Sequence, residues 1–161
     1  KLEDVTGSRK SAEEVMERYD RSMPVLIAWS ESVVDEMYQY GYVRSMPPTS
    51  RIRFLPNPYG RYADPGKLER EAVNTIIQAT SADITKSAMV ELNSLSKLVD
   101  THLLLQIHDE LVYEVPIQYA EEWLGVMKDV MINTTYKPEG LSLKVDGKIG
   151  KTWYCNHYGF G

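Results

Sequence analysis

The sequence is poor in cysteine and in positive charge. Its single cysteine, Cys155, excludes an internal disulfide framework. With 18 Lys and Arg against 23 Asp and Glu, the net charge of −5 argues against a protein that wraps nucleic acid with a uniformly basic surface, although it is compatible with a local basic patch. Cys155 and His157 are two potential zinc ligands, but no further ligands occur at a suitable spacing, so no zinc site is expected.

The chain also lacks long apolar runs. None approaches the roughly 20 residues that are needed to span a bilayer, and the N-terminal Lys1–Asp4 does not resemble a signal peptide. The first residue is not methionine, so we expect a processed, trimmed or partial chain. With 161 residues and 43% hydrophobic content, the chain is long and apolar enough to form the core of one domain.

Composition divides the chain into three segments. Residues 1–41 have a mainly helical pattern, in which Pro24 suits the first turn of a helix that runs to Tyr40 and Gly41 suits its C-terminal cap. Residues 42–66 are rich in proline and can form only brief strands. Residues 67–161 contain the longest helical pattern, followed by the strongest strand signals.

The middle segment is the one place where basic and aromatic residues alternate. We expect two short strands there, at Tyr42–Arg44 and Arg53–Leu55. Arginine beside aromatic side chains suits phosphate contacts and stacking on bases, and the residues concerned are Arg44, Arg51, Arg53, Arg61, Tyr42, Phe54, Tyr59 and Tyr62. A solvated loop whose arginines cover neighbouring acidic surface would have the same composition.

A long helix is predicted from Lys67 to about Leu98, because apolar residues recur at helical spacing; they include Val73, Ile77, Ile84 and Ala88. Arg70, Asn74 and Gln78 are spaced by four, so they lie on one edge of this helix. All three can donate hydrogen bonds. By spacing alone, this edge is a solvated face.

The strongest local signal is the stretch from Leu103 to Pro116. Two apolar runs, each as long as a buried strand, flank the polar triplet His108-Asp109-Glu110, so we expect a hairpin with two adjacent carboxylates at its tip. Such a tip is a candidate site for a hard metal ion, and equally an acidic solvated turn. After Pro116 an amphipathic helix is expected, and the alternation over Leu141–Ile149 predicts a strand that adjoins the hairpin.

Three blocks together resemble the C-terminal part of the polymerase domain of family A DNA polymerases. Leu105–Glu114 is similar to motif C of that family, and Glu69–Gln78, followed by Ala82-Asp83-Ile84, is similar to the long helix before it. Gly41-Tyr42-Val43, with Arg51, Arg53 and Pro56, resembles the arginine-rich ribbon of the family.

The resemblance implies an α+β fold. Residues 1–41 would be a helical segment on the fingers side, and residues 42–66 an Arg- and Pro-rich ribbon and loop. Residues 67–161 would be a long helix and part of the palm, with the motif C hairpin, an adjoining strand and long helices packed on them. The activity implied is template-dependent DNA synthesis.

The resemblance also assigns roles to individual residues. Asp109 would bind catalytic Mg²⁺, with Glu110 assisting and His108 near the primer terminus. Arg70, Asn74 and Gln78 would contact template or primer in the minor groove, where similar acceptors occur in every base pair. Arg51 and Arg53 would contact phosphates. The partners would be primer–template DNA, deoxynucleoside triphosphates and an upstream polymerase fragment or chain, in the cytoplasm of a bacterium or of a phage-infected host, without a membrane.

The departures from the family pattern set a limit on this interpretation. Nothing here matches the second metal-binding aspartate of the family or its nucleotide-binding helix. The two Mg²⁺ ions would therefore be shared with residues outside the chain, and we expect the isolated chain, as one part of a split or cleaved polymerase, to be inactive. Within the matching blocks, Ala79 and Ser50 stand where the family usually has glycine, Ser81 where it has alanine, and Ile52 where it has arginine. Two alternatives are a non-catalytic nucleic-acid-binding subunit and a single-subunit RNA polymerase fragment.

Overall fold

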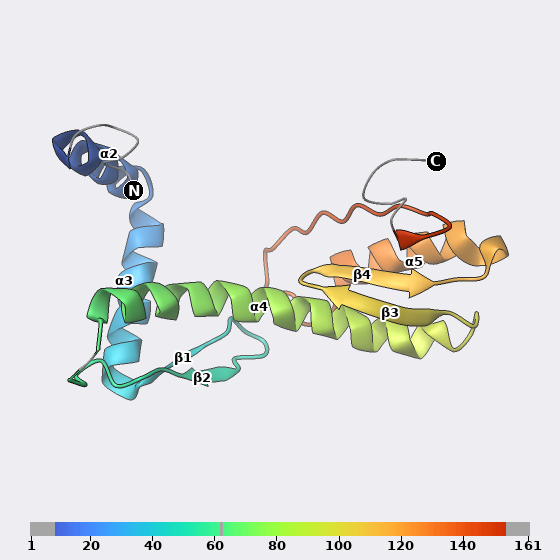
Figure 1. Ribbon diagram of the computed structural model, residues 1–161, viewed down its shortest axis with the longest axis horizontal. Helices are drawn as coiled ribbons and strands as arrows, with labels where there is room; N and C mark the ends of the chain where they lie inside the picture. The colour runs from blue at the N-terminus through green and yellow to red at the C-terminus, as the bar shows by residue number, and fades with distance from the viewer. Residues whose placement is uncertain (1–8, 62, 154–161) are drawn as a thin grey trace. The chain divides into compact units, whose positions relative to one another are not determined.

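The computed structural model describes residues 9–61 and 63–153 (Figure 1). The segment before Arg9 and the pair Cys155 and His157 lie outside this range. Two compact units can be separated within it, one around residues 9–43 and 52–75 and the other around residues 44–51 and 76–153. Helix α4, Pro65–Ser96, contributes its first part to the first unit and the rest to the second.

The first unit contains two N-terminal helices, α2 at Arg9–Ser22 and the predicted α3 at Pro24–Tyr40. Pro24 is in the first turn of α3, where its missing N–H costs no hydrogen bond. Gly41 caps the other end with φ of 73°, and its N–H donates to the carbonyl of Met37 over 2.9 Å. Both predictions are confirmed. Among the described residues of this unit, the buried hydrophobic side chains are Val33, Met37, Val43, Leu55, Leu68 and Ala72.

Strands β1, Tyr42–Arg44, and β2, Ile52–Phe54, form a two-stranded ribbon. The second strand begins one residue earlier than predicted. In β1 only Val43 is buried, whereas all three residues of β2 are exposed. The N–H of Leu55 donates to the carbonyl of Gly41 over 2.9 Å, which ties the end of the ribbon to the cap of α3.

The second unit is built around the antiparallel hairpin of β3, His102–Ile107, and β4, Glu110–Glu114. A short 3-10 turn, Ile117–Tyr119, leads into α5, Ala120–Asn133. Figure 1 shows the hairpin beside α5 and the second part of α4. The core there joins one buried residue from each of three elements, namely Leu92 of α4, Leu111 of β4 and Trp123 of α5.

The α+β fold class is confirmed, but two details of the sheet are wrong. No strand is assigned between Leu141 and Ile149, although Leu143 and Val145 alternate with exposed neighbours as a strand would. Alternation describes an extended chain, and a strand also needs a backbone partner, which β3 and β4 do not provide. The runs of the hairpin are also less buried than predicted, because Leu103, Leu104 and Leu105 are 38%, 54% and 44% exposed.

The buried face of α4 also differs from the predicted apolar stripe. Ile77 is 50% exposed, whereas Thr75, Thr80, Asp83, Thr85 and Ser87 are buried. The inward side of the helix therefore combines these polar side chains with buried apolar ones at helical spacing, namely Leu68, Ala72, Ile76, Ala88 and Leu92. Among the helices that the structure describes, none is both long and apolar enough to cross a membrane.

Candidate functional site

The tip of the hairpin is a two-residue loop, His108-Asp109. Ile107 and Glu110 form the last pair of the ladder, so Glu110 is the first residue of β4 rather than part of the turn. His108 has φ of 54°, a left-handed conformation that histidine adopts more readily than most residues. The side-chain amide of Gln106 donates to the carbonyl of His108 over 3.2 Å. Asp109 therefore stands on a short loop supported by a strand on each side.

The side chains of His108, Asp109 and Glu110 are all exposed. Carboxylate oxygens are the ligands that Mg²⁺ prefers, and this ion takes one or two carboxylates while keeping several waters. Within residues 9–61 and 63–153, no three His, Cys, Asp or Glu side chains are grouped closely enough to hold a metal ion. The tip thus fits part of a magnesium coordination shell, and it offers no complete protein cage.

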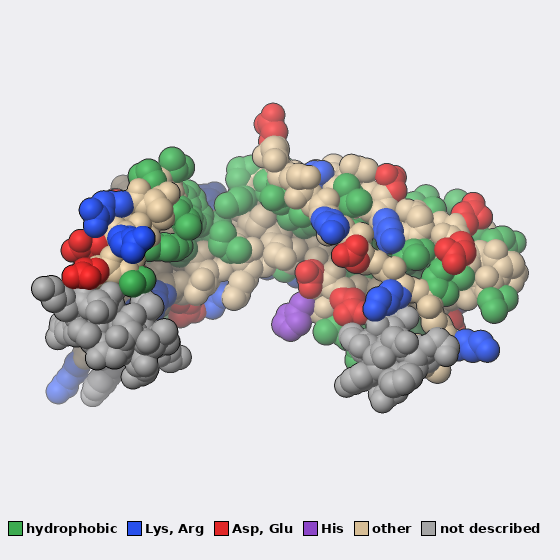
Figure 2. Space-filling view, turned by 90° about the horizontal axis from the view of Figure 1, so that it is seen from above, with side chains coloured by type: hydrophobic (Ala, Val, Ile, Leu, Met, Phe, Trp, Pro, Cys, Tyr) green, Lys and Arg blue, Asp and Glu red, His purple; other side chains and the backbone are tan. Residues whose placement is uncertain are grey.

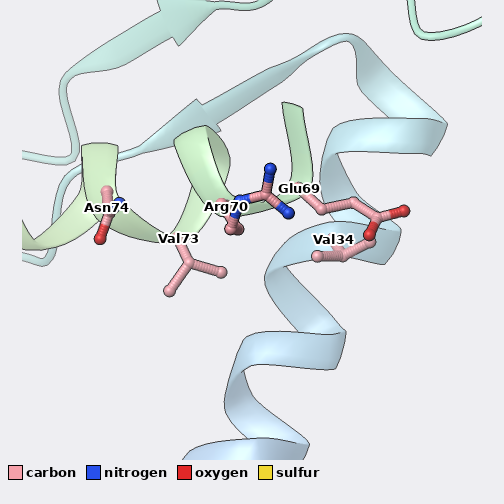
Figure 3. A pocket seen from close by; sticks show the side chains of 5 residues that line it. All are labelled: Val34, Glu69, Arg70, Val73 and Asn74. Carbon is pink, nitrogen blue, oxygen red and sulfur yellow. The ribbon is translucent and has the colours of Figure 1, made fainter. Parts of the chain in front are cut away.

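Arg70, Asn74 and Gln78 are exposed on α4, as predicted. Arg70 and Asn74 line a pocket of about 380 Å³ in the first unit, together with Val34, Glu69 and Val73. Figure 3 shows Val34 projecting from α3 and the other four residues from neighbouring turns of α4. Gln78 lies further along the same helix, in the part that belongs to the second unit. The helix edge thus presents a guanidinium and two amides to solvent.

Glu69, which lines this pocket, makes a contact that sequence reasoning missed. The Tyr38 hydroxyl donates to Glu69 Oε1 over 2.9 Å, and the Tyr59 ring lies 5.8 Å from the Tyr38 ring. The hydrogen bond to Glu69, together with burial and the nearby carboxylate charge, raises the pKa of Tyr38. This bond joins α3 to α4 beside Arg70. No local spacing signals it, because the two residues are 31 positions apart.

The two arginines expected at phosphates are both paired with carboxylates of α4. Arg53 Nη2 lies 2.7 Å from Glu71 Oε1 in the first unit, and Arg51 Nη2 lies 2.9 Å from Asp83 Oδ1 in the second. Both arginines remain about half exposed, at 51% and 54%. Figure 2 shows basic side chains scattered among acidic ones on the face in view, in keeping with the net charge of −5. Each arginine therefore has one carboxylate partner and an accessible side.

The contacts of Asp83 on α4 are also ones that sequence reasoning missed. Burial by itself would raise the pKa of its carboxyl group, but hydrogen bonds from Thr49 and Ser45 and the neighbouring Arg51 charge together lower it below its ordinary value. The group is therefore held as a carboxylate. The available signal was the small residues one turn away on each side, Ala79 and Ser87, which favour close packing of this face of α4.

Residues 2–155 match the model of DNA polymerase family A. The chain is 40% identical over 145 residues to the thermostable DNA polymerase I of Thermus filiformis, and 39% identical over 150 residues to DNA polymerase I of Bacillus caldotenax. These alignments cover 89% and 91% of the chain but only 17% of each relative.

A solved structure, the POL domain of Pol1 from M. smegmatis in complex with DNA primer-template and dNTP, is similar in fold. Its TM-score is 0.69 at 30% identity, and the match covers 78% of this chain and 22% of that one. The resemblance deduced from the motif C hairpin, the preceding helix and the arginine-rich ribbon is confirmed. The chain belongs to DNA polymerase family A.

Proposed function

We propose that this chain is the C-terminal portion of the polymerase domain of a DNA-directed DNA polymerase, and that it takes part in template-dependent nucleotidyl transfer. The observation that carries the proposal is the family match over residues 2–155 combined with Asp109 at the tip of a two-residue hairpin loop. The similar M. smegmatis structure is described as a complex with primer-template and dNTP, which supports the same ligands here.

In this proposal, Asp109 is a ligand of catalytic Mg²⁺, Glu110 assists beside it, and His108 lies near the primer terminus. A bound pair of Mg²⁺ ions would activate the attacking 3′ oxygen and neutralise the pyrophosphate leaving group. The contribution of the chain is a carboxylate with little freedom, because a two-residue loop between paired strands holds it. The paired strands also place Glu110 directly after it.

The remaining metal ligands would come from polypeptide outside this sequence, either another part of a longer chain or a separate one. Two observations support this. No group of three potential ligands occurs among the described residues. In addition, β3 presents Leu103, Leu104 and Leu105, which are 38–54% exposed, and a two-stranded sheet has strand edges that can accept further strands. The rest of the domain would cover these exposed leucine side chains.

The exposed edge of α4 would follow the minor groove of the primer–template. Side-chain donors of Asn74, Gln78 and Arg70 can reach the purine N3 and pyrimidine O2 acceptors, which every base pair presents at similar positions. Such contacts report the shape of a correct pair without reading its sequence. Arg51 and Arg53, with their accessible sides, would contact backbone phosphates.

Primer extension tests the proposal. The chain alone is expected to incorporate no nucleotide, whereas the chain combined with the rest of its polymerase domain extends a primer in the presence of Mg²⁺. In the complete enzyme, Asp109→Asn should lower kcat by about 10³-fold or more, because charge stabilisation by a metal is worth several kcal/mol.

Asp100→Asn is the matched control. Asp100 is 89% exposed, precedes β3 and has φ of 52°, which asparagine tolerates, so its replacement should leave kcat unchanged. Extension by the isolated chain would contradict the shared metal site. A complete complex that binds primer–template tightly without incorporating nucleotides would instead favour the non-catalytic binding subunit.

A further inference from the structure

The loop between β1 and β2, residues 45–51, is closed by hydrogen bonds between its two ends. The N–H of Ser45 donates to the carbonyl of Arg51, and the N–H of Arg51 donates to Ser45 Oγ, each over 2.9 Å. The hydroxyls of Ser45 and Thr49 lie 3.0 Å apart. Ser45 is only 3% exposed, so these bonds are shielded from water. The loop therefore has a defined shape of its own.

Hydrogen bonds and an ion pair attach this loop to α4. The N–H of Met46 donates to Thr80 Oγ1 over 2.9 Å. The Thr49 hydroxyl donates to Asp83 Oδ2 over 2.8 Å, and Arg51 Nη2 lies 2.9 Å from Asp83 Oδ1. The Asp83 side chain is 8% exposed, and a buried carboxylate is stable only when partners compensate for its lost hydration. Both oxygens of Asp83 are therefore engaged in holding the loop.

Within this network of contacts between the loop and α4, the Arg51 side chain is accessible to solvent, because it is 51% exposed. Among the described residues, its guanidinium contacts Asp83 and the carbonyl of Ala79, the latter at 3.4 Å, and both contacts are made by Nη2. A guanidinium has five N–H donors in one rigid plane. Nε and Nη1 thus remain able to bind an anion, in a plane that Asp83 orients. A side chain restrained in this way loses less conformational entropy when it binds a phosphate.

We infer that Asp83 is a positioning residue, which holds Arg51 in the orientation that binds a phosphate of primer–template DNA. The inference rests on the proposed function in one respect, namely that the phosphate belongs to the primer–template. It predicts that removing the negative charge of Asp83 weakens DNA binding. A carboxylate near DNA repels phosphates, so removing its charge should tighten binding if electrostatic repulsion were its only effect. Loss of positioning should weaken binding instead.

The test measures the dissociation constant for primer–template over a series of salt concentrations, using the complete polymerase of which this chain is part. Asp83→Asn is expected to weaken binding about tenfold and to reduce the salt slope by about 1, as Arg51→Ala does. The double variant should bind no more weakly than Arg51→Ala alone, because both changes remove the same contact. Arg51→Lys, which keeps the charge but loses the rigid plane, should also weaken binding.

Glu91→Gln is the matched control. Glu91 is another α4 carboxylate with several hydrogen-bond donors, but among the described residues these are Ser87, Thr134 and Thr135, and no arginine. This variant should lose stability while keeping the affinity and salt slope of the wild type. Tighter or unchanged binding by Asp83→Asn, or additive effects in the double variant, would overturn the positioning role, as would unchanged binding by Arg51→Lys. A wild-type enzyme that does not bind primer–template would overturn the proposed function as well.

Discussion

The hydroxyl of Thr134 donates a hydrogen bond of 2.9 Å to the carboxylate of Glu91, which joins the C-terminal end of α5 to the second part of α4. The same carboxylate accepts bonds from the Thr135 N–H at 3.0 Å and the Ser87 hydroxyl at 3.1 Å. Thr134 is 2% exposed, so water does not compete for this contact. The network holds α5 in the position from which Trp123 contributes to the core around the hairpin.

Glu91→Gln should lower the free energy of unfolding by about 1.5–3 kcal/mol, the usual contribution of hydrogen bonds to a charged group. Burial alone would raise the pKa of Glu91, but the bonds from Thr135, Thr134 and Ser87 lower it below the ordinary 4.5. The stabilisation is therefore fully present above that value and is lost as the pH falls through the lower pKa of the folded state. Urea unfolding from pH 7 to pH 3 measures this. If the wild type and the variant lost stability in parallel, Glu91 would not be the group responsible.

Ser50→Gly should raise the free energy of unfolding by about 0.5–1 kcal/mol. Ser50 has φ of 47°, a left-handed conformation that costs a non-glycine residue about 1–2 kcal/mol, of which about 0.5–1 kcal/mol is offset by the greater freedom of glycine in the unfolded chain. Ser50→Ala keeps the strain and serves as the control, so it should bring no gain. Thermal unfolding of the wild type, Ser50→Gly and Ser50→Ala measures these differences in stability. A destabilised Ser50→Gly variant would contradict the argument.

Gly125→Ala should stabilise α5 by about 1 kcal/mol, since alanine has the higher helix propensity and an added Cβ at this exposed position meets no atom within 4 Å. Gly41→Ala offers the contrasting case. Space is equally free there, but φ of 73° makes any L side chain unfavourable, so this variant should be destabilised. Denaturant midpoints of the two variants should thus move in opposite directions.

Asn74→Ala and Gln78→Ala should each weaken primer–template binding by the complete polymerase about fivefold, since one hydrogen bond is worth about 1 kcal/mol. The loss should be similar for A·T and G·C pairs at the primer end, because the minor-groove acceptors are alike. Asn93→Ala removes an exposed amide elsewhere on α4 and should leave binding unchanged. A loss that depends strongly on the identity of the pair would contradict the shape-sensing role.

Elements whose signals are local could be predicted from the sequence. Pro24 and Gly41 mark the two ends of α3 within their own neighbourhood, and the polar residues between two apolar runs mark the hairpin that carries Asp109. The spacing of Arg70, Asn74 and Gln78 is a property of a single helix, so their shared exposed edge was predictable too. Backbone sterics and side-chain periodicity operate over a few residues, and a sequence displays them directly.

Strand pairing and burial, in contrast, depend on contacts between distant parts of the chain. Leu141–Ile149 alternates like a strand, but a ladder requires a second backbone that the segment itself cannot supply. The apolar run of β3 predicted burial, yet Leu104 is 54% exposed because burial depends on what packs against a strand. In the sequence, Asp83 is one more polar residue of a helix. In the folded chain it bonds to Thr49 and Arg51 of a distant loop. Hydrogen bonds between residues more than 30 positions apart leave no local pattern, and only the folded chain reveals them.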